Sequence, residues 1–177
     1  MNGEGAVSVP PHVVFLCTGN AARSVMAGAM LAARAEGVRI STAGTHVIEG
    51  QPISWRTRDA MVEVGVTPVA HRTRQLAPHD LESDLIVGMA TEHVAYVRRR
   101  HPEAASRTAS LRRLCRDLPH EPGPLAQRVA ALSLEAVQLE AWEDVADPAG
   151  GDLDVFVACA RELLHLVSDL APRLDPT

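Results

Sequence analysis

The sequence has 177 residues, of which 46% are hydrophobic and 22% are charged, and its formal net charge is −5 at pH 7. This length suits one ordinary domain, and the composition is that of a globular protein. No apolar run approaches the roughly 20 residues that span a bilayer, which excludes a membrane-spanning helix. The net acidic charge and the small number of aromatic residues make nucleic acid a poor partner. We therefore expect partners that are neither nucleic acid nor membrane.

The start of the chain and its cysteines indicate the cellular setting. Residues 1–11 lack the pattern of a secretory signal and contain Gly and Pro, so we expect a flexible leader ahead of a single domain over residues 12–177. The three cysteines are Cys17, Cys115 and Cys159. Their odd number and wide spacing favour neither a disulfide framework nor a metal site. The sequence predicts a cytoplasmic protein with free thiols and no cofactor, and it leaves the oligomeric state open.

Hydrophobic periodicity predicts strands that alternate with helices. We expect a strand over residues 12–17, a helix over 22–35, a strand over 38–42 and a helix over 54–64. A strand over 84–89, a helix over 91–100 and a weak strand over 107–111 follow. After a loop rich in Pro and Gly at residues 119–124, helices are expected over 125–142 and 153–170. This alternation predicts an α/β fold with a doubly wound parallel sheet, in which ligands bind at the carboxyl ends of the strands.

The segment after the first predicted strand carries the strongest chemical signal. It reads Cys17-Thr18-Gly19-Asn20-Ala21-Ala22-Arg23-Ser24. Five residues between a cysteine and an arginine can wrap around a tetrahedral oxyanion and aim successive backbone N–H groups at it, and the start of a helix adds positive field. We therefore expect residues 18–24 to bind phosphate, because Gly19, Ala21 and Ala22 leave the backbone accessible.

Two side chains of this loop are predicted to be catalytic. Arg23 can bind two phosphate oxygens with its planar fork of N–H groups. The same field favours the thiolate form of Cys17, which under a bound phosphate is an in-line nucleophile. Cys115 and Cys159 fall within helical apolar patterns and are expected in the core.

Cleavage of a phosphate ester also requires an acid that protonates the leaving oxygen, a contribution of about 10² to 10⁴ in rate. Asp147 is the candidate, since Pro148 stiffens its turn and the neighbouring acidic residues Glu143 and Asp144 favour the protonated form. Asp-Pro is also a common turn, so the local sequence leaves this assignment open.

The run from Val13 to Asn20, followed by Arg23-Ser24, closely resembles the low-molecular-weight protein tyrosine phosphatases. The likeness continues through residues 41–46, 71–76 and 84–89 and ends at Asp147-Pro148. The resemblance implies a four-stranded parallel sheet and metal-free hydrolysis of a phosphorylated protein or a small phosphate ester through a phosphocysteine intermediate.

The same resemblance assigns roles to individual residues. Asp147 would first protonate the leaving group and then activate water. A hydrogen-bond network would hold the phosphate-binding loop in shape, and its members would be Asn20, Ser24, Thr42 and His71. Ser24 would also donate a hydrogen bond to the thiolate of Cys17.

Several positions depart from the family's pattern. Ala22 stands where many members have a second cysteine that protects the nucleophile as a disulfide, so Cys17 is expected to oxidise more easily. Members that act on phosphotyrosine have aromatic residues where this chain has Val47-Ile48 and Ala149-Gly150, and Trp55 is the nearest candidate for a replacement wall. Ala21 matches neither the large aliphatic residue typical of phosphotyrosine relatives nor the threonine typical of phosphoarginine relatives.

Two other functions remain open on the sequence. An arsenate reductase that depends on a low-molecular-weight thiol would share the start of the loop and need only Cys17. A catalytically silent phosphate-binding regulatory module would need only the loop itself. The joint presence of Cys17, Arg23 and Asp147 favours the phosphatase.

Overall fold

The computed structural model describes residues 9–174 and contains a four-stranded parallel sheet with the strand order β2-β1-β3-β4. The strands are β1 (His12–Cys17), β2 (Arg39–Gly44), β3 (Leu85–Gly88) and β4 (Thr108–Ser110). In this register Cys17 lies beside Gly44, and Leu16 lies beside Gly88. The strands therefore end together at one edge, which confirms the predicted α/β fold and its parallel sheet.

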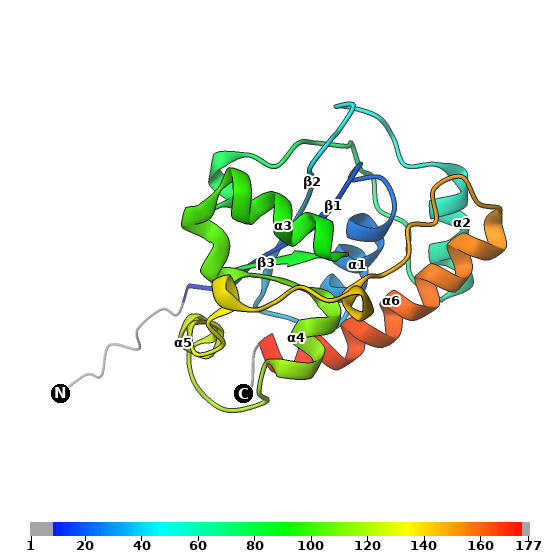
Figure 1. Cartoon of the computed structure of the whole chain (residues 1–177). Coiled ribbons are helices and arrows are strands. Elements are labelled where there is room, and N and C mark those ends of the chain that lie inside the picture. The colour runs from blue at the N-terminus through cyan, green and yellow to red at the C-terminus, as the bar shows by residue number, and fades with distance from the viewer. Residues whose placement is uncertain (1–8, 175–177) are drawn as a thin grey trace.

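Helices cover both faces of the sheet, as Figure 1 shows. They are α1 (Arg23–Ala32), α2 (Trp55–Glu63), α3 (Thr91–Arg100), α4 (Leu111–Asp117), α5 (Leu125–Ala130) and α6 (Leu153–Leu174). Short 3₁₀ turns lie at Pro78–Asp80, Pro102–Arg107, Leu134–Ala136 and Ala141–Glu143. The helices α1, α4 and α6 pack on one face through a large apolar cluster, and α3 covers the other face through a smaller one.

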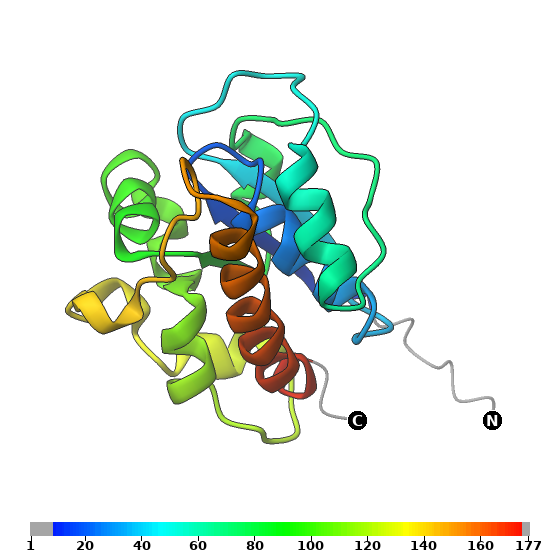
Figure 2. The same cartoon turned by 90° about the vertical axis from the view of Figure 1, so that its right-hand side faces the viewer.

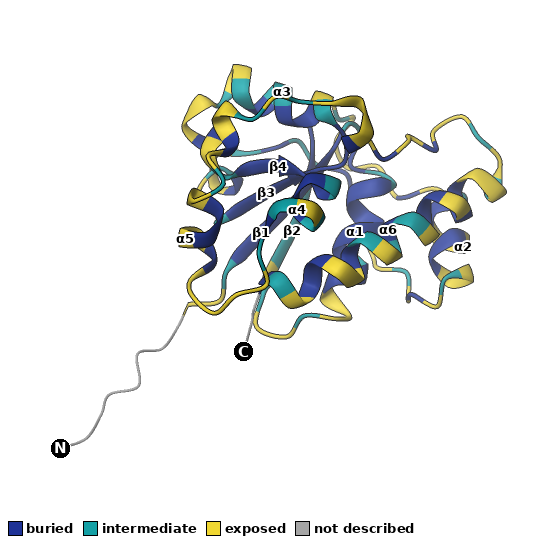
Figure 3. Ribbon diagram, turned by 60° about the horizontal axis from the view of Figure 1, so that its bottom comes forward, coloured by how far each residue is buried: buried dark blue, intermediate teal, exposed yellow. Residues whose placement is uncertain are grey.

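The central strand explains why the sheet forms where it does. Every residue of β1 is buried, because helices cover both of its sides. A strand that is buried on both faces reads as a continuous apolar run rather than an alternating one, and residues 13–16 of this chain read Val-Val-Phe-Leu. Figure 3 shows the buried strands surrounded by helices whose outer faces are exposed.

The prediction of one continuous helix over residues 125–142 is wrong beyond the first turns. α5 ends at Ala130, and Ser133 then adopts a left-handed conformation with φ of 48°. Farther on, the carbonyl oxygens of Leu134 and Gln138 accept hydrogen bonds from the side chains of Arg98 and Arg113. Because arginine donors from other elements take carbonyls that a helix would use internally, the segment becomes a series of turns.

The remaining elements lie close to their expected positions, with shifted ends. α6 continues to Leu174, four residues beyond the expected end, and α4 was not among the expected helices. Part of the leader expected over residues 1–11 lies outside the described residues, and β1 begins at His12. No helix in the described part of the chain is long and apolar enough to cross a membrane.

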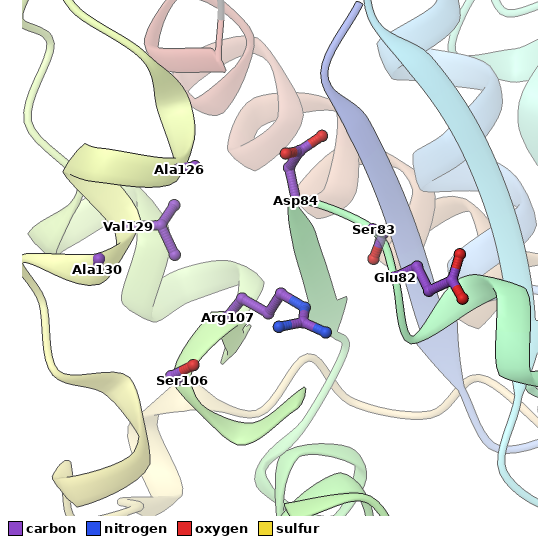
Figure 4. Close-up of a pocket in the computed structure, with 8 residues that line it drawn as sticks. All are labelled: Glu82, Ser83, Asp84, Ser106, Arg107, Ala126, Val129 and Ala130. Carbon is purple, nitrogen blue, oxygen red and sulfur yellow. The ribbon is translucent and has the colours of Figure 1, made fainter. Parts of the chain in front are cut away.

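A cavity of about 340 Å³ lies at the amino ends of β3 and β4. This edge of the sheet is opposite to the carboxyl edge, where Cys17 lies. Figure 4 shows its lining residues, which include Asp84 and Arg107. The guanidinium of Arg107 donates hydrogen bonds to the carbonyl oxygens of Leu81 and Glu103, and Asp84 accepts one from the backbone N–H of His12. These charged groups hold the chain together around the cavity.

Candidate active site

Residues 17–24, called the phosphate loop from here on, connect β1 to α1 at the carboxyl edge of the sheet. The chain after β2 holds this loop by two backbone hydrogen bonds of 3.0 Å, from Thr45 N to Cys17 O and from His46 N to Thr18 O. Gly44 permits this approach, because a Cβ atom there would lie only 2.5 Å from Thr18 O. The glycine that ends β2 thus sets how closely the phosphate loop packs on the sheet.

Cys17 stands at the end of β1 with 3% of its surface exposed, and its Sγ lies 3.0 Å from Ser24 Oγ. The hydroxyl of Ser24 can therefore donate to a thiolate at this position. Burial raises the pKa of both Cys115 and Cys159 to about 12, which keeps these two thiols protonated at neutral pH. Cys159 is buried and Cys115 is partly buried against the core, as expected.

Asn20 joins the phosphate loop to two other segments. Its Nδ2 donates hydrogen bonds of 3.0 Å to Ser24 Oγ and to Thr42 Oγ1 on β2. Its Oδ1 accepts a hydrogen bond of 3.0 Å from the backbone N–H of Arg74. The residue has a φ of 52°, a left-handed conformation that asparagine adopts more readily than most residues.

His71 completes this arrangement. Its Nε2 lies 2.9 Å from Asn20 O and 3.1 Å from Asn20 Oδ1. Both oxygens are acceptors, so Nε2 carries the hydrogen. Burial lowers the pKa of His71, and the nearby Arg74 lowers it further against the raising effect of the bond to Asn20. The structure therefore brings together the four residues of the expected network, Asn20, Ser24, Thr42 and His71.

Arg23 and Asp147 meet across the site although they are far apart in sequence. Arg23 is 3% exposed, and its guanidinium donates to Val145 O at 2.9 Å and to Asp147 Oδ2 at 2.8 Å. Asp147 Oδ1 accepts from the backbone N–H of Ala149 at 3.0 Å, which fixes the carboxylate on its turn. Figure 2 shows the segment before α6 beside the loop after β1.

The acidic residues that precede Asp147 are held by donors of their own. Glu143 is 1% exposed and accepts hydrogen bonds from the side chains of Arg113 and Ser110. Asp144 Oδ1 accepts from the backbone N–H of Thr91 at 2.6 Å. The nearest charged partner of Asp147 is the cation of Arg23, whereas the sequence had suggested the neighbouring carboxylates.

His93, at the start of α3, is a site residue that the sequence did not indicate. It is 1% exposed, and its Nδ1 accepts a hydrogen bond of 3.0 Å from the backbone N–H of Ala90. Its Nε2 therefore carries the hydrogen and donates to Thr18 Oγ1 at 3.0 Å. Burial, with the added effect of the Arg23 charge, lowers the pKa of His93 to about 3. The one signal in the sequence was its place just after the carboxyl end of a strand.

The mouth of the site contains few large side chains. Ala149 and Gly150 follow Asp147, and Ile48 is 79% exposed. Trp55, the expected replacement wall, is 48% exposed at the start of α2, where the guanidinium of Arg56 lies 4.8 Å from the centre of its ring. A cavity of about 320 Å³ adjoins the phosphate loop on the side of α2.

Known proteins resemble this chain over nearly its whole length. The sequence profile of the family described as low molecular weight phosphotyrosine protein phosphatase matches residues 12–176. A protein-arginine-phosphatase of Geobacillus stearothermophilus is 30% identical over 169 residues, which cover 94% of this chain and 98% of that protein. The crystal structure of a low molecular weight protein tyrosine phosphatase from T. tengcongensis has a TM-score of 0.72 at 28% identity and covers 90% of this chain and 97% of that one.

Proposed function

Because this chain belongs to the low molecular weight phosphotyrosine protein phosphatase family, we propose that it hydrolyses phosphate monoesters with Cys17 as nucleophile, Arg23 as phosphate ligand and Asp147 as general acid. The observation that carries these assignments is the meeting of three segments at one point. The thiol of Cys17 ends β1, Arg23 begins α1 beneath the same loop, and Asp147 is bound to Arg23 from a turn more than 120 residues later.

Phosphate binding uses the loop backbone and the free donors of Arg23. A guanidinium has five N–H groups, and two of those on Arg23 bind Val145 O and Asp147 Oδ2. The remaining N–H groups can bind phosphate oxygens. A phosphate dianion competes with Asp147 for this cation and can release the carboxyl group from its ion pair with Arg23. Substrate binding thereby frees the side chain that the reaction requires as an acid.

The first chemical step transfers the phosphoryl group to the enzyme. The Cys17 thiolate attacks phosphorus in line, the bond from phosphorus to the ester oxygen breaks, and that oxygen takes the proton of Asp147. Ser24 Oγ, 3.0 Å from the sulfur, stabilises the thiolate before attack and after it leaves. In the second step water attacks phosphorus, Asp147 accepts a proton from the water, and Cys17 departs as a thiolate.

The role of Asp147 is tested with leaving groups of different acidity. Purified protein is expected to hydrolyse nitrophenyl phosphate and phenyl phosphate in the presence of a chelator, and Cys17→Ser is expected to abolish both activities. Asp147→Ala should lower kcat for phenyl phosphate by about 10² to 10⁴, because phenolate is a poor leaving group. The loss of kcat for nitrophenyl phosphate should be much smaller, because nitrophenolate is a good leaving group whose oxygen departs without a proton.

Four results would contradict the proposal. Unchanged turnover in the Cys17→Ser protein would remove Cys17 as nucleophile. Equal losses for both esters in the Asp147→Ala protein would remove Asp147 as the acid. A wild type that is inert to esters but reduces arsenate with a small thiol would favour the reductase, and one that only binds phosphate would favour the silent module.

Phosphorylated proteins are the substrates we propose, with small phosphate esters as a second class, and the cytoplasm is the proposed location. The relatives named above are one arginine phosphatase and one tyrosine phosphatase. Ala21, Ala149 and Gly150 leave the mouth of the site wide, which suits a leaving group held by its flanking chain more than by stacking.

A further inference from the structure

The cavity beside the phosphate loop has one cationic side chain and no acidic one in its lining. Its volume is about 320 Å³. The side chains of Arg56 and Phe156 line it together with small residues on both rims, which are Ala21, Ala22, Ala149 and Gly150. Figure 1 shows the turn before α6 next to the start of α2, and residues of both segments line this cavity. Phe156 is 7% exposed, so the floor is apolar and the only charge in the lining is that of Arg56.

Arg56 has no counter-ion among residues 9–174. Within the described part of the chain it forms no ion pair, and its buried Nε has no hydrogen-bond partner. Its guanidinium lies over the ring of Trp55, with Cζ 4.8 Å from the ring centre. A buried donor without a partner is costly, and a stacked guanidinium keeps its N–H edge available for an anion.

The cavity is tied directly to the reaction centre. Thr57, the next residue after Arg56, is fully buried and donates a hydrogen bond of 3.1 Å from its Oγ1 to Ala21 O in the phosphate loop. Ser54 caps the same turn by accepting from Thr57 N at 3.2 Å. These bonds fix the first turn of α2 against the loop. The cavity therefore has a fixed position directly beside the loop that would hold the phosphate.

We propose that this cavity is a substrate subsite in which Arg56 binds a second anionic group, placed next to the phosphoryl group that is cleaved; the inference rests on the function proposed above. In a phosphoprotein the second anion is the carboxylate of an acidic residue beside the phosphorylated one. In a small substrate it is a carboxylate or phosphate of the ester itself. The shared chemistry is an oxyanion that accepts the N–H edge of a guanidinium.

The test compares paired substrates. One pair consists of tyrosine-phosphorylated peptides that differ only in Glu or Gln beside the phosphorylated residue, and the other of two small aryl phosphates that carry a carboxylate or its amide. The wild type should favour the anionic member of at least one pair by about tenfold in kcat/KM, which corresponds to about 1.4 kcal/mol. Arg56→Ala should bring that ratio close to one. The pair that shows the preference identifies the source of the anion.

Two further variants distinguish a specific role of Arg56 from a general loss of charge and from misfolding. Arg58→Ala removes the same charge from an exposed position of the same helix and should leave the ratio unchanged. Arg56→Glu should invert the preference in favour of a peptide with Lys at the flanking position, a gain that misfolding cannot produce.

Two results would overturn the subsite. One is a wild type that hydrolyses both members of both pairs equally well. The other is an equal change of the ratio in Arg56→Ala and Arg58→Ala. A wild type that cleaves none of these esters would instead contradict the proposed function itself.

Discussion

Asn20 shows how much of the site depends on one small side chain. The side-chain amide of Asn20 forms hydrogen bonds with Ser24, Thr42 and the backbone N–H of Arg74. Its backbone oxygen accepts a hydrogen bond from His71. Ser24 in turn lies 3.0 Å from the sulfur of Cys17. The position of the hydroxyl beside the nucleophile therefore depends on an amide that never contacts the sulfur. A buried network of this kind keeps one geometry because each broken bond leaves a polar group unsatisfied.

His93 leads to a prediction about acid sensitivity. Burial lowers its pKa in the folded protein to about 3, below the ordinary value of 6.5. Between these values the unfolded chain binds one more proton than the folded protein, so stability falls as the pH falls. His93 alone should contribute a slope of up to about 1.4 kcal/mol per pH unit between about pH 6 and pH 4. Denaturant unfolding at several pH values should show a shallower slope for His93→Gln than for the wild type.

The control for this prediction is His165→Gln, which removes an exposed histidine from α6 and should leave the slope as it is in the wild type. Parallel stability curves for the wild type and His93→Gln would show that His93 is not held in its neutral form by the fold.

At this scale the spacing of residues predicted the phosphate loop, whereas the distant residues Thr42, His71 and Asp147 were expected from the family resemblance. Cys17, Arg23 and Ser24 lie within eight residues, and the loop geometry needs only their order. His93 and Arg56 were not predicted, because their surroundings come from segments distant in sequence. His93 looks like any polar residue of an amphipathic helix until the phosphate loop is placed against it, and Arg56 looks like a solvated side chain.

At the scale of elements, the segment that carries Asp147 is fastened by a buried ion pair. Arg113 on α4 binds Glu143, and their side chains are 6% and 1% exposed. Burial alone would raise the pKa of Glu143, but the hydrogen bonds from Arg113 and Ser110 lower it below its ordinary value. The guanidinium of Arg113 also lies 4.9 Å from the ring centre of Trp142. These contacts fix the 3₁₀ turn four residues ahead of Asp147.

Loss of the Glu143 charge should therefore weaken both stability and catalysis. Glu143→Gln should lower the free energy of unfolding by about 2 kcal/mol, since it leaves the buried Arg113 cation with weaker partners. It should also lower kcat for phenyl phosphate, because Asp147 is no longer held firmly beside the leaving group. Denaturant unfolding and steady-state kinetics measure the two effects.

Glu162→Gln provides the matched control, because its ion pair with Arg112 is about one-third exposed. Partly exposed ion pairs contribute about 1 kcal/mol or less to the free energy of unfolding. Glu162 lies within α6, well after the turn that carries Asp147. Equal, small effects of the two substitutions would contradict the role assigned to the Arg113–Glu143 pair.

The same segment shows where periodicity fails as a predictor. Residues 125–142 repeat apolar positions at helical spacing, yet only the part up to Ala130 is α-helical. The apolar residues are buried all the same, as Leu134 is 1% exposed. Burial of the pattern was predictable, but its backbone path depended on arginines of α3 and α4 that bind its carbonyl oxygens.

For the whole molecule, the order of elements determined the architecture. Alternating strands and helices allow few parallel arrangements once crossovers are right-handed. The expected four-stranded parallel sheet is observed, and its strand order, which the sequence left open, is β2-β1-β3-β4. All loops that follow the carboxyl ends of the strands then meet at one edge. The phosphate loop, the start of α3 and the start of α2 lie there because of topology, and the turn with Asp147 reaches the same edge through its bond to Arg23.

Detection of a covalent phosphocysteine intermediate would test directly whether Cys17 is the nucleophile. Wild-type protein in the course of aryl phosphate hydrolysis is quenched rapidly with denaturant, digested and analysed by mass spectrometry. We expect one phosphoryl group on the peptide that contains Cys17, bound through sulfur and lost once the substrate is exhausted. Turnover with an unmodified Cys17 peptide, or with the phosphoryl group on another residue, would contradict this assignment.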